Sequence, residues 1–377
     1  MLRLQLRFVL ATMLHARKRT ALAVAGVAAA VFLIFLELTI HSSVVYTSGA
    51  LTGRLAYDLA IVPSGYRALV MSTPFHQRRL SQALAVEGVA SAAPLYRAYG
   101  EFKAPGAPHD ARVLLLAFRP EDRVFPQLGE ETVQSLYQPG TIAFDRCSQR
   151  VVGDPQPGMT AICNRRRVLV GQHFELGAGF AAPGLVLMSR ATYASVTRFS
   201  LDDVQFGLLR LVPGADRRVV QAELRRQLPD DVLVLDRDEV EARQRLQWET
   251  VSSSGKITRS GVAFACAVAL IVLLQVMSSD VLQRLAEYAT LAALGYGSSF
   301  VTAVVALQGL LMGAAGYALG LGLALPVRGV LAGATKVPNF LSARDCLLVL
   351  AAVLGASLLS GMFALEKLRR ADPAELF

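Results

Sequence analysis

The sequence has few of the residues that soluble enzymes use for chemistry. It contains five histidines, four cysteines and one tryptophan among 377 residues, and only 18% of its residues are charged. No HExxH or G-x-S-x-G motif occurs, and the histidines and cysteines do not cluster at metal-ligand spacing. These absences argue against a zinc protease or an α/β-hydrolase, and we expect no catalytic residues, no resident metal and no cofactor.

A nucleotide-binding loop is also missing. The segment SSGKIT contains the Gly255 and Lys256 pair of a phosphate loop, but it lacks the earlier glycine and the Ser or Thr that should follow the lysine. If this protein depends on ATP, another chain must bind the nucleotide and its Mg²⁺.

Apolar residues, by contrast, are abundant and clustered. They make up 53% of the sequence, and the mean hydropathy of +0.43 is that of a membrane protein. The net charge of +9 could reflect nucleic acid or anionic lipid headgroups as partners. Because several basic clusters lie beside apolar runs, we interpret the charge as membrane topology and expect membrane lipids, not nucleic acid, as neighbours.

Four apolar runs are long enough to cross a hydrocarbon core about 30 Å thick. A basic interfacial helix at residues 1–19 precedes them, and we predict spans at residues 20–41, 257–278, 300–325 and 346–365. The first run is longer than a signal-peptide core of about 7 to 15 residues, so we expect it to stay uncleaved. Lys and Arg residues are concentrated near both termini and near the segment 279–299. The positive-inside rule therefore places the N-terminus, this segment and the tail at 366–377 in the cytoplasm.

The long segment between the first two spans, residues 42–256, is then extracytoplasmic, as is the loop 326–345. Strand–helix–strand patterns at residues 54–99 and 201–236 predict an α+β sheet layer whose halves flank an insertion at residues 100–200. Asp236 and Glu239 have capping-box spacing and open a stalk, residues 237–256, that is either rigid or jointed at its serines. The expected fold is a membrane α-helical protein with four transmembrane helices (1+3) and a large extracytoplasmic α+β domain.

Two cysteines in the insertion, Cys147 and Cys163, enclose a Gly/Pro-rich loop. In an oxidising compartment, a disulfide that closes this loop is favoured. Two reduced buried thiols or a metal pair are the alternatives, although no histidines stand nearby at ligand spacing.

Polar residues within the predicted spans are candidates for function. Glu37 and His41 share one helix face near the outer end of the first span, where they either act in transport or pair with each other and reach the interface. Gln275 and Gln308 are expected to form interhelical hydrogen bonds. Small residues at three- and four-residue steps predict close helix packing, within the chain or across a dimer: Gly309, Gly313, Gly316 and Gly320.

The segment 279–299 is a short amphipathic stretch between the second and third spans. Its apolar residues recur at three- and four-residue steps, which predicts a helix with a small-residue face that ends before Gly295. Because a helix held between two spans cannot shift without moving both, a cytoplasmic protein that grips it could act on the membrane; the alternative is an ordinary surface helix. The predicted coupling residues are Arg284, Leu285, Glu287, Tyr288, Ala289, Leu291, Ala292, Gly295 and Tyr296.

The order of one span, a large outer domain and three spans resembles the FtsX/MacB superfamily of ABC-transporter permeases, and within it the DevC type associated with glycolipid export. AEYATLAALGY, at Ala286–Tyr296, is similar to the cytoplasmic coupling segment of that family. The tail KLRRADPAELF, at Lys367–Phe377, resembles the family's tail with its Asp-Pro-Ala signature, and FDR, at Phe144–Arg146, resembles a DevC-type outer-domain motif.

The resemblance implies a non-catalytic permease subunit that forms a homodimer on a dimer of cytoplasmic ABC ATPases. Such a permease would lie in the cell inner membrane, with both termini cytoplasmic, and pass ATP-driven motion to its periplasmic domain. A DevC-like protein would export a glycolipid or another amphiphile with a HlyD-type periplasmic adaptor and an outer-membrane channel. An FtsX- or LolCE-like regulator or lipoprotein-releasing permease is one alternative. A membrane sensor is another, although only residues 366–377 follow the last predicted span.

Overall fold

The structure, a computed structural model, describes residues 2–177, 179, 181–251, 253–283, 290, 296, 298–335 and 341–370. The chain divides into two compact units. The helical unit contains residues 1–42, 257–332 and 339–377, and the α+β unit contains residues 43–256 and 333–338.

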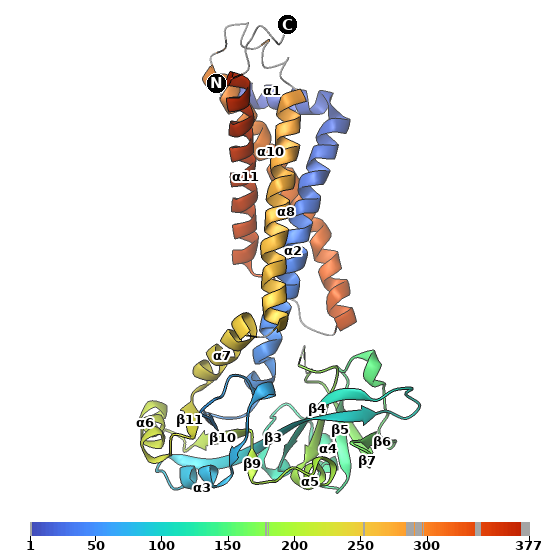
Figure 1. Cartoon of the computed structure of the whole chain (residues 1–377), viewed down its shortest axis with the longest axis vertical. Helices are drawn as coiled ribbons and strands as arrows, with labels where there is room; N and C mark the ends of the chain where they lie inside the picture. The colour runs from blue at the N-terminus through green and yellow to red at the C-terminus, as the bar shows by residue number, and fades with distance from the viewer. Residues whose placement is uncertain are drawn as a thin grey trace. The chain divides into compact units, whose positions relative to one another are not determined.

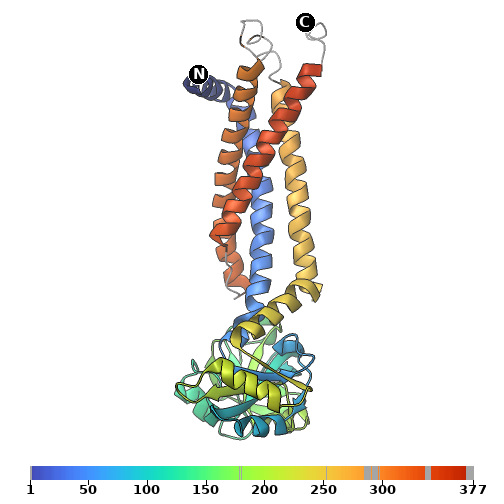
Figure 2. The same ribbon diagram turned by 90° about the vertical axis from the view of Figure 1, so that its left-hand side faces the viewer.

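The helical unit is built from α1 and four long helices (Figure 1). Their bounds are α1 Leu2–His15, α2 Arg17–Gly53, α8 Ser253–Gln283, α10 Ser298–Thr335 and α11 Ala343–Arg370. In two views at right angles, α2, α8, α10 and α11 run alongside one another (Figures 1 and 2). All four long helices extend past the predicted spans, α8 and α11 by a few residues at each end. The largest extensions are those of α2, which continues to Gly53, and of α10, which continues through Pro326 to Thr335. A proline removes one helical hydrogen bond without necessarily ending the helix, so the predicted outer loop 326–345 is helical in its first part.

Within the described residues, three helical segments are long and apolar enough to cross a membrane: Arg17–Val44, Gly255–Val276 and Ser299–Gly333. The predicted fourth span falls in α11, and that α11 also crosses the membrane stays a prediction. Large apolar side chains are exposed on these helices, among them Phe264 at 72% and Val330 at 73%. Because water would penalise so much exposed apolar surface, the helices suit a lipid environment.

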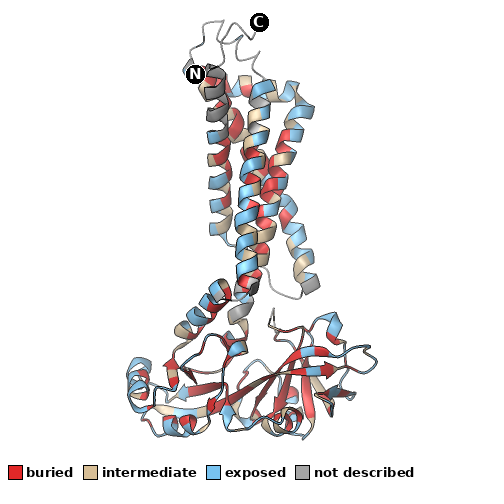
Figure 3. Ribbon diagram, in the orientation of Figure 1, coloured by how far each residue is buried: buried red, intermediate tan, exposed pale blue. Residues whose placement is uncertain are grey.

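Small and branched side chains pack the interior of the helical unit. Val27, Val31 and Phe35 of α2 are fully or almost fully buried, together with Leu273 of α8 and Met312 of α10. Figure 3 shows buried residues interspersed with exposed ones along each long helix. Buried residues that recur about every 3.6 positions give each helix one packed face and one exposed face.

The α+β unit contains, among its described residues, a nine-stranded sheet in the order β11-β1-β10-β3-β4-β8-β5-β7-β6. The strands are β1 Leu59–Pro63, β3 Val89–Lys103, β4 Ala111–Phe118, β5 Thr141–Asp145, β6 Thr160–Cys163, β7 Arg166–Phe174, β8 Leu185–Ser189, β10 Phe206–Leu211 and β11 Val232–Leu235. A short pair, β2 Phe75–His76 and β9 Asp203–Val204, lies apart from this sheet. The helices of this unit are α3 Arg78–Leu84, α4 Glu130–Ser135, α5 Arg190–Thr197, α6 Arg217–Gln227 and α7 Arg237–Leu246.

Strand β3 joins the two parts of this sheet. Its first half pairs with β10 and its second half with β4, and Phe102 near its end pairs with Cys163 of β6. The β3–β6 pairing closes β3, β4, β8, β5, β7 and β6 into a ring built mainly from the predicted insertion. The two strand–helix–strand segments on either side of that insertion meet in the other part, where β1 lies between β10 and β11.

Close packing over β10 requires a glycine. A Cβ atom at Gly207 would collide with Leu80 of α3 and would lie 3.3 Å from both Ile61 and Phe75. A side chain at this position would therefore force Leu80 to move and would crowd Ile61 and Phe75.

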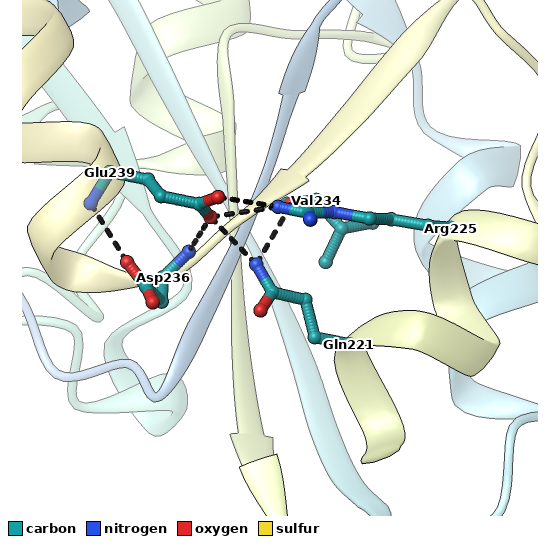
Figure 4. A network of polar contacts seen from close by, with 5 residues as sticks. All are labelled: Gln221, Arg225, Val234, Asp236 and Glu239. Carbon is teal, nitrogen blue, oxygen red and sulfur yellow. Dashed lines mark hydrogen bonds and ion pairs between the residues drawn. The ribbon is translucent and has the colours of Figure 1, made fainter. Parts of the chain in front are cut away.

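A polar network fixes the start of α7 to its neighbours (Figure 4). Asp236 caps α7, and Glu239 completes the capping box that the sequence predicts. The Glu239 carboxylate also accepts hydrogen bonds from Arg225 at 2.8 Å and from Gln221 at 2.7 Å, both on α6. Burial works to raise the pKa of Glu239, but the hydrogen bonds that it accepts outweigh burial and lower the pKa below its ordinary value.

Candidate functional site

The predicted coupling segment lies between two described helices, α8, which ends at Gln283, and α10, which begins at Ser298. Most of the predicted coupling residues lie outside the described residues, and their roles stay predictions: Arg284, Leu285, Glu287, Tyr288, Ala289, Leu291, Ala292 and Gly295. The structure does define the ends to which this segment is attached.

Tyr296 marks the end of the segment nearest α10. Its ring lies over that of Phe300, with 4.7 Å between the ring centroids and 31° between the ring planes. An aromatic contact of this kind stabilises the approach of the chain to the helix by about 0.5–1.5 kcal/mol. Tyr296 is thus the one predicted coupling residue, within the described part of the chain, whose contact can be named.

Helix α1 packs on the same end of α10. Val9 is 1% exposed and forms one apolar cluster with Phe300, Val301, Val304 and Val305. The α10 residues form two adjacent pairs, 300–301 and 304–305, one helical turn apart, so they lie on a single face. The sequence predicts α1 as an interfacial helix but does not indicate that its buried side contacts α10.

This contact gives the coupling segment a second connection to the helical unit. Only Ala16 separates the end of α1 from the start of α2 at Arg17. The start of α10 is therefore connected to α8 through the chain and to α2 through its contact with α1.

The predicted small-residue positions bring α10 against two helices of the same chain. A Cβ atom at Gly309 would lie 3.0 Å from the carbonyl oxygen of Ser357 in α11, and one at Gly313 would lie 2.7 Å from the Ser357 Oγ. These distances are shorter than ordinary contact, so α11 can approach only because both positions are glycine.

The next two glycines face α2. A Cβ at Gly316 would lie 2.5 Å from the Val27 Cβ, and one at Gly320 would lie 2.7 Å from the Ala28 carbonyl oxygen. Among the described residues, these four glycines therefore lie against α11 and α2 of the same chain. Packing across a dimer stays a prediction.

Glu37 and His41 join α2 to α8. The His41 Nδ1 lies 3.2 Å from the Thr258 Oγ1, and the Glu37 carboxylate lies against Gly261, where a Cβ would be 2.7 Å from its Oε2. Both side chains are half-buried. The two residues share a helix face as predicted, but each contacts α8.

The two glutamines differ in position. Gln308 is buried in α10, at 4% exposure, next to the first packing glycine. Gln275 is exposed on α8 and makes no hydrogen bond to any residue that the structure describes, so the interhelical bond predicted for it is wrong within this chain. Gln275 is two residues beyond the buried Leu273, which turns it about 200° around the helix and away from the packed face.

The disulfide predicted between Cys147 and Cys163 is also wrong, because neither residue takes part in a disulfide. Cys163 is completely buried in β6, and burial raises the pKa of its thiol to about 12. Cys147 lies in the turn after β5, where its backbone N–H donates to Asp145. Each cysteine is held by its own strand or turn, which sequence spacing does not reveal.

The FDR motif lies at the end of β5. Phe144 is buried and stacks on Phe102 at 5.5 Å. Asp145 is completely buried and accepts hydrogen bonds from the backbone N–H groups of Leu176 at 3.2 Å and Gly177 at 2.6 Å. Burial raises the pKa of its carboxyl, against the opposing effect of these hydrogen bonds. The motif therefore holds the 176–177 loop against the end of the strand.

No group of three or more His, Cys, Asp or Glu side chains among the described residues could hold a metal ion.

Comparison with known sequence families identifies the C-terminal helices. The family described as FtsX-like permease C-terminal matches residues 259–373, which include most of α8, the coupling segment, α10 and α11. These C-terminal helices are an FtsX-like permease domain. The chain shows no significant sequence match to a curated protein.

Some solved structures are similar to part of this chain at low sequence identity. The periplasmic region of MacB from Actinobacillus actinomycetemcomitans is 12% identical with a TM-score of 0.37, over 51% of this chain and 94% of that one. The extracellular domain of the transporter YknZ from Gram-positive bacteria is 12% identical with a TM-score of 0.36, over 48% and 99%. A domain of a putative permease from Porphyromonas gingivalis is 14% identical with a TM-score of 0.33, over 48% and 88%. With scores this low, the family assignment depends on the C-terminal match.

Proposed function

We propose that this permease is the membrane subunit of an ABC-type exporter and passes the motion of a separate cytoplasmic ATPase to its α+β unit. In this proposal the α+β unit is extracytoplasmic, both termini are cytoplasmic, and two copies stand on an ATPase dimer that binds ATP and Mg²⁺. The permease itself catalyses no reaction.

One observation carries the proposal: the region that matches the FtsX-like family contains a short segment joining α8 to α10, and α10 begins in a packed contact with α1. A partner that moved this segment would act on two helices directly and on α2 through α1. The segment can transmit a displacement only if the helix ends to which it is attached are firmly packed. The burial of Val9, Val304 and Val305 at 0–2% exposure supports such packing.

The packing of the helices favours motion as a group. Glycines let the α10 backbone contact α11 and α2 at distances where a side chain cannot fit, so these helices cannot slide past one another without separating. Two of the helices also continue into the chain of the α+β unit: α2 extends to Gly53 and α8 begins at Ser253. Through these connections, a displacement in the membrane would reach the α+β unit.

The finer part of the proposal concerns the cargo. By its similarity to the DevC type, we propose export of a glycolipid or another amphiphile, with a HlyD-type adaptor and an outer-membrane channel as partners. The support for this part is the resemblance of FDR, at Phe144–Arg146, to a DevC-type outer-domain motif.

The test is to add bulk to the coupling segment. The permease would be reconstituted with the ATPase encoded beside it, and ATP hydrolysis and export would be measured for Ala289→Trp and Ala292→Trp. We expect both variants to remain in the membrane as dimers but to uncouple hydrolysis from export. Ala351→Trp, at an exposed position of α11, is the matched control and should behave as the wild type.

Normal export by Ala289→Trp and Ala292→Trp would contradict coupling through this segment. Proteins that co-purify with the permease test the cargo separately, because an adaptor supports export, whereas a cell-wall hydrolase would indicate a regulator of the FtsX kind.

A further inference from the structure

The α+β unit contains an open cavity of about 600 Å³ beside the FDR motif. It lies between the end of β5, the turn Arg150–Val152, the following loop and the end of β7. Its polar lining includes Arg146, Ser148, Arg150, Asp154 and His173. Neither the family match nor the proposed coupling mechanism gives this cavity a role.

Arg146 is held in the cavity by His173. The Arg146 Nε donates to the His173 Nδ1 at 3.2 Å, and the His173 Nε2 lies 2.8 Å from the Pro155 carbonyl oxygen. A carbonyl oxygen can only accept and a guanidinium can only donate, so the imidazole carries its proton on Nε2 and accepts on Nδ1. The neutral imidazole of His173 therefore orients the Arg146 guanidinium and adds no charge of its own.

A second cation, Arg150, lines the same cavity. Arg150 begins the 3₁₀ turn and forms no ion pair with any described residue. The cavity also contains one carboxylate, that of Asp154, so two guanidinium groups outnumber one acid. Guanidinium groups bind phosphate and carboxylate oxygens through pairs of parallel hydrogen bonds, and two of them can neutralise a doubly charged phosphate.

The third component is a buried hydroxyl. Ser148 is 8% exposed, and its Oγ has no hydrogen-bond partner in the described part of the chain. A buried polar atom without a partner is unfavourable, and rotation about a single side-chain torsion would let this hydroxyl donate to a ligand. The site thus offers two cations and one unused donor.

We propose that this cavity binds a phosphate-type anion, either as the headgroup of an anionic amphiphile or as a small soluble phosphate. Arg146 and Arg150 supply the charge, Ser148 a hydrogen bond, and Asp154 limits the affinity through repulsion. The proposal does not depend on coupling to an ATPase.

The experiment measures binding to the full-length permease in detergent by titration calorimetry. The probes are inorganic phosphate and short-chain phosphatidic acid, with short-chain phosphatidylcholine as the zwitterionic control. We expect Arg146→Gln and Arg150→Gln each to weaken binding about tenfold. Asp154→Asn should strengthen binding by about two- to fivefold, because it removes a like charge. Arg217→Gln, at an exposed position of α6 outside the cavity, is the control for loss of one positive charge.

Ser148→Ala separates binding from folding. Without ligand this variant should unfold at the same temperature as the wild type or at a higher one, because an unpartnered buried hydroxyl is removed. Its affinity for phosphate should fall severalfold. A loss of stability without a loss of affinity would contradict the role of Ser148 as a donor.

The two probes distinguish the source of the phosphate. Binding of phosphatidic acid alone identifies a lipid headgroup, and binding of both probes identifies a site open to soluble phosphate. The proposal is overturned if neither probe binds saturably at millimolar concentrations, or if Arg146→Gln and Arg150→Gln bind as tightly as Arg217→Gln.

Discussion

The contact of Gly320 with α2 allows a test in which two neighbouring glycine substitutions act in opposite directions. A Cβ at Gly320 would lie 2.7 Å from the Ala28 carbonyl oxygen and 2.8 Å from the Val31 Cβ, whereas ordinary contact begins at 3.4 Å. Gly320→Ala therefore requires α10 and α2 to separate by several tenths of an ångström. The atom that blocks the methyl group belongs to the backbone of α2, so no side-chain rotation can relieve the clash.

The expected change in the free energy of unfolding is the sum of two opposing effects. Overpacking of this kind costs about 1–3 kcal/mol. Replacing a helical glycine by alanine stabilises the folded protein by up to about 1 kcal/mol, because the unfolded chain then has less conformational freedom to lose. We expect Gly320→Ala to lower the free energy of unfolding by about 1–2 kcal/mol.

Gly322 is the matched control, two residues further along α10. No described atom lies within 4 Å of a Cβ placed there. Gly322→Ala should therefore leave stability unchanged or raise it by about 0.5–1 kcal/mol. The assay is reversible unfolding in mixed micelles, followed by circular dichroism. Equal changes in both variants would refute the close approach of α10 to α2.

Three further predictions concern other parts of the chain. Val9→Asp should detach α1 from the start of α10 and reduce the stimulation of the partner ATPase, whereas Leu14→Asp, at a position 59% exposed, should have a smaller effect in the same ATPase assay. The pKa of Glu239 is lower in the folded protein than in the unfolded chain, so its contribution to stability is present above about pH 4.3 and is lost as the pH falls through the folded value. Acid titration of stability should thus show a smaller loss for Glu239→Gln than for the wild type, and an identical loss would show that the network in Figure 4 does not depend on the charge. Cys163, buried and with its pKa raised to about 12, should react with a thiol reagent only after unfolding, and rapid labelling of Cys163 in the native protein would contradict its place in β6.

Together, these contacts describe how the helical unit is tied together. The coupling segment joins α8 to α10, α1 joins α10 to α2, and Glu37 and His41 join α2 to α8. In the proposed mechanism, these connections let a displacement of the coupling segment move α8, α10 and α2 together. Mutations in α1 or at the packing glycines would then impair coupling without touching the ATPase contact.

The sequence by itself determined the class of protein and the parts of it that depend on local pattern. Long apolar runs predicted the membrane helices, the spacing of Asp236 and Glu239 predicted the capped start of α7, and the segment at Ala286–Tyr296 indicated the permease family. These features could be predicted because hydropathy, capping and motif chemistry are set by residues that are neighbours in the chain.

Only the tertiary structure decided which surfaces meet. It directed the α10 glycines to α11 and α2, placed Val9 on α10, turned Gln275 outward and gave Cys147 and Cys163 separate places. It also brought β6 to β3 and Arg146 to His173, although many residues separate each pair in the chain. A periodic pattern records which face of a helix or strand is apolar or small, but it contains no information about the partner that covers that face. That choice depends on packing between distant segments, where shape and the exclusion of voids decide.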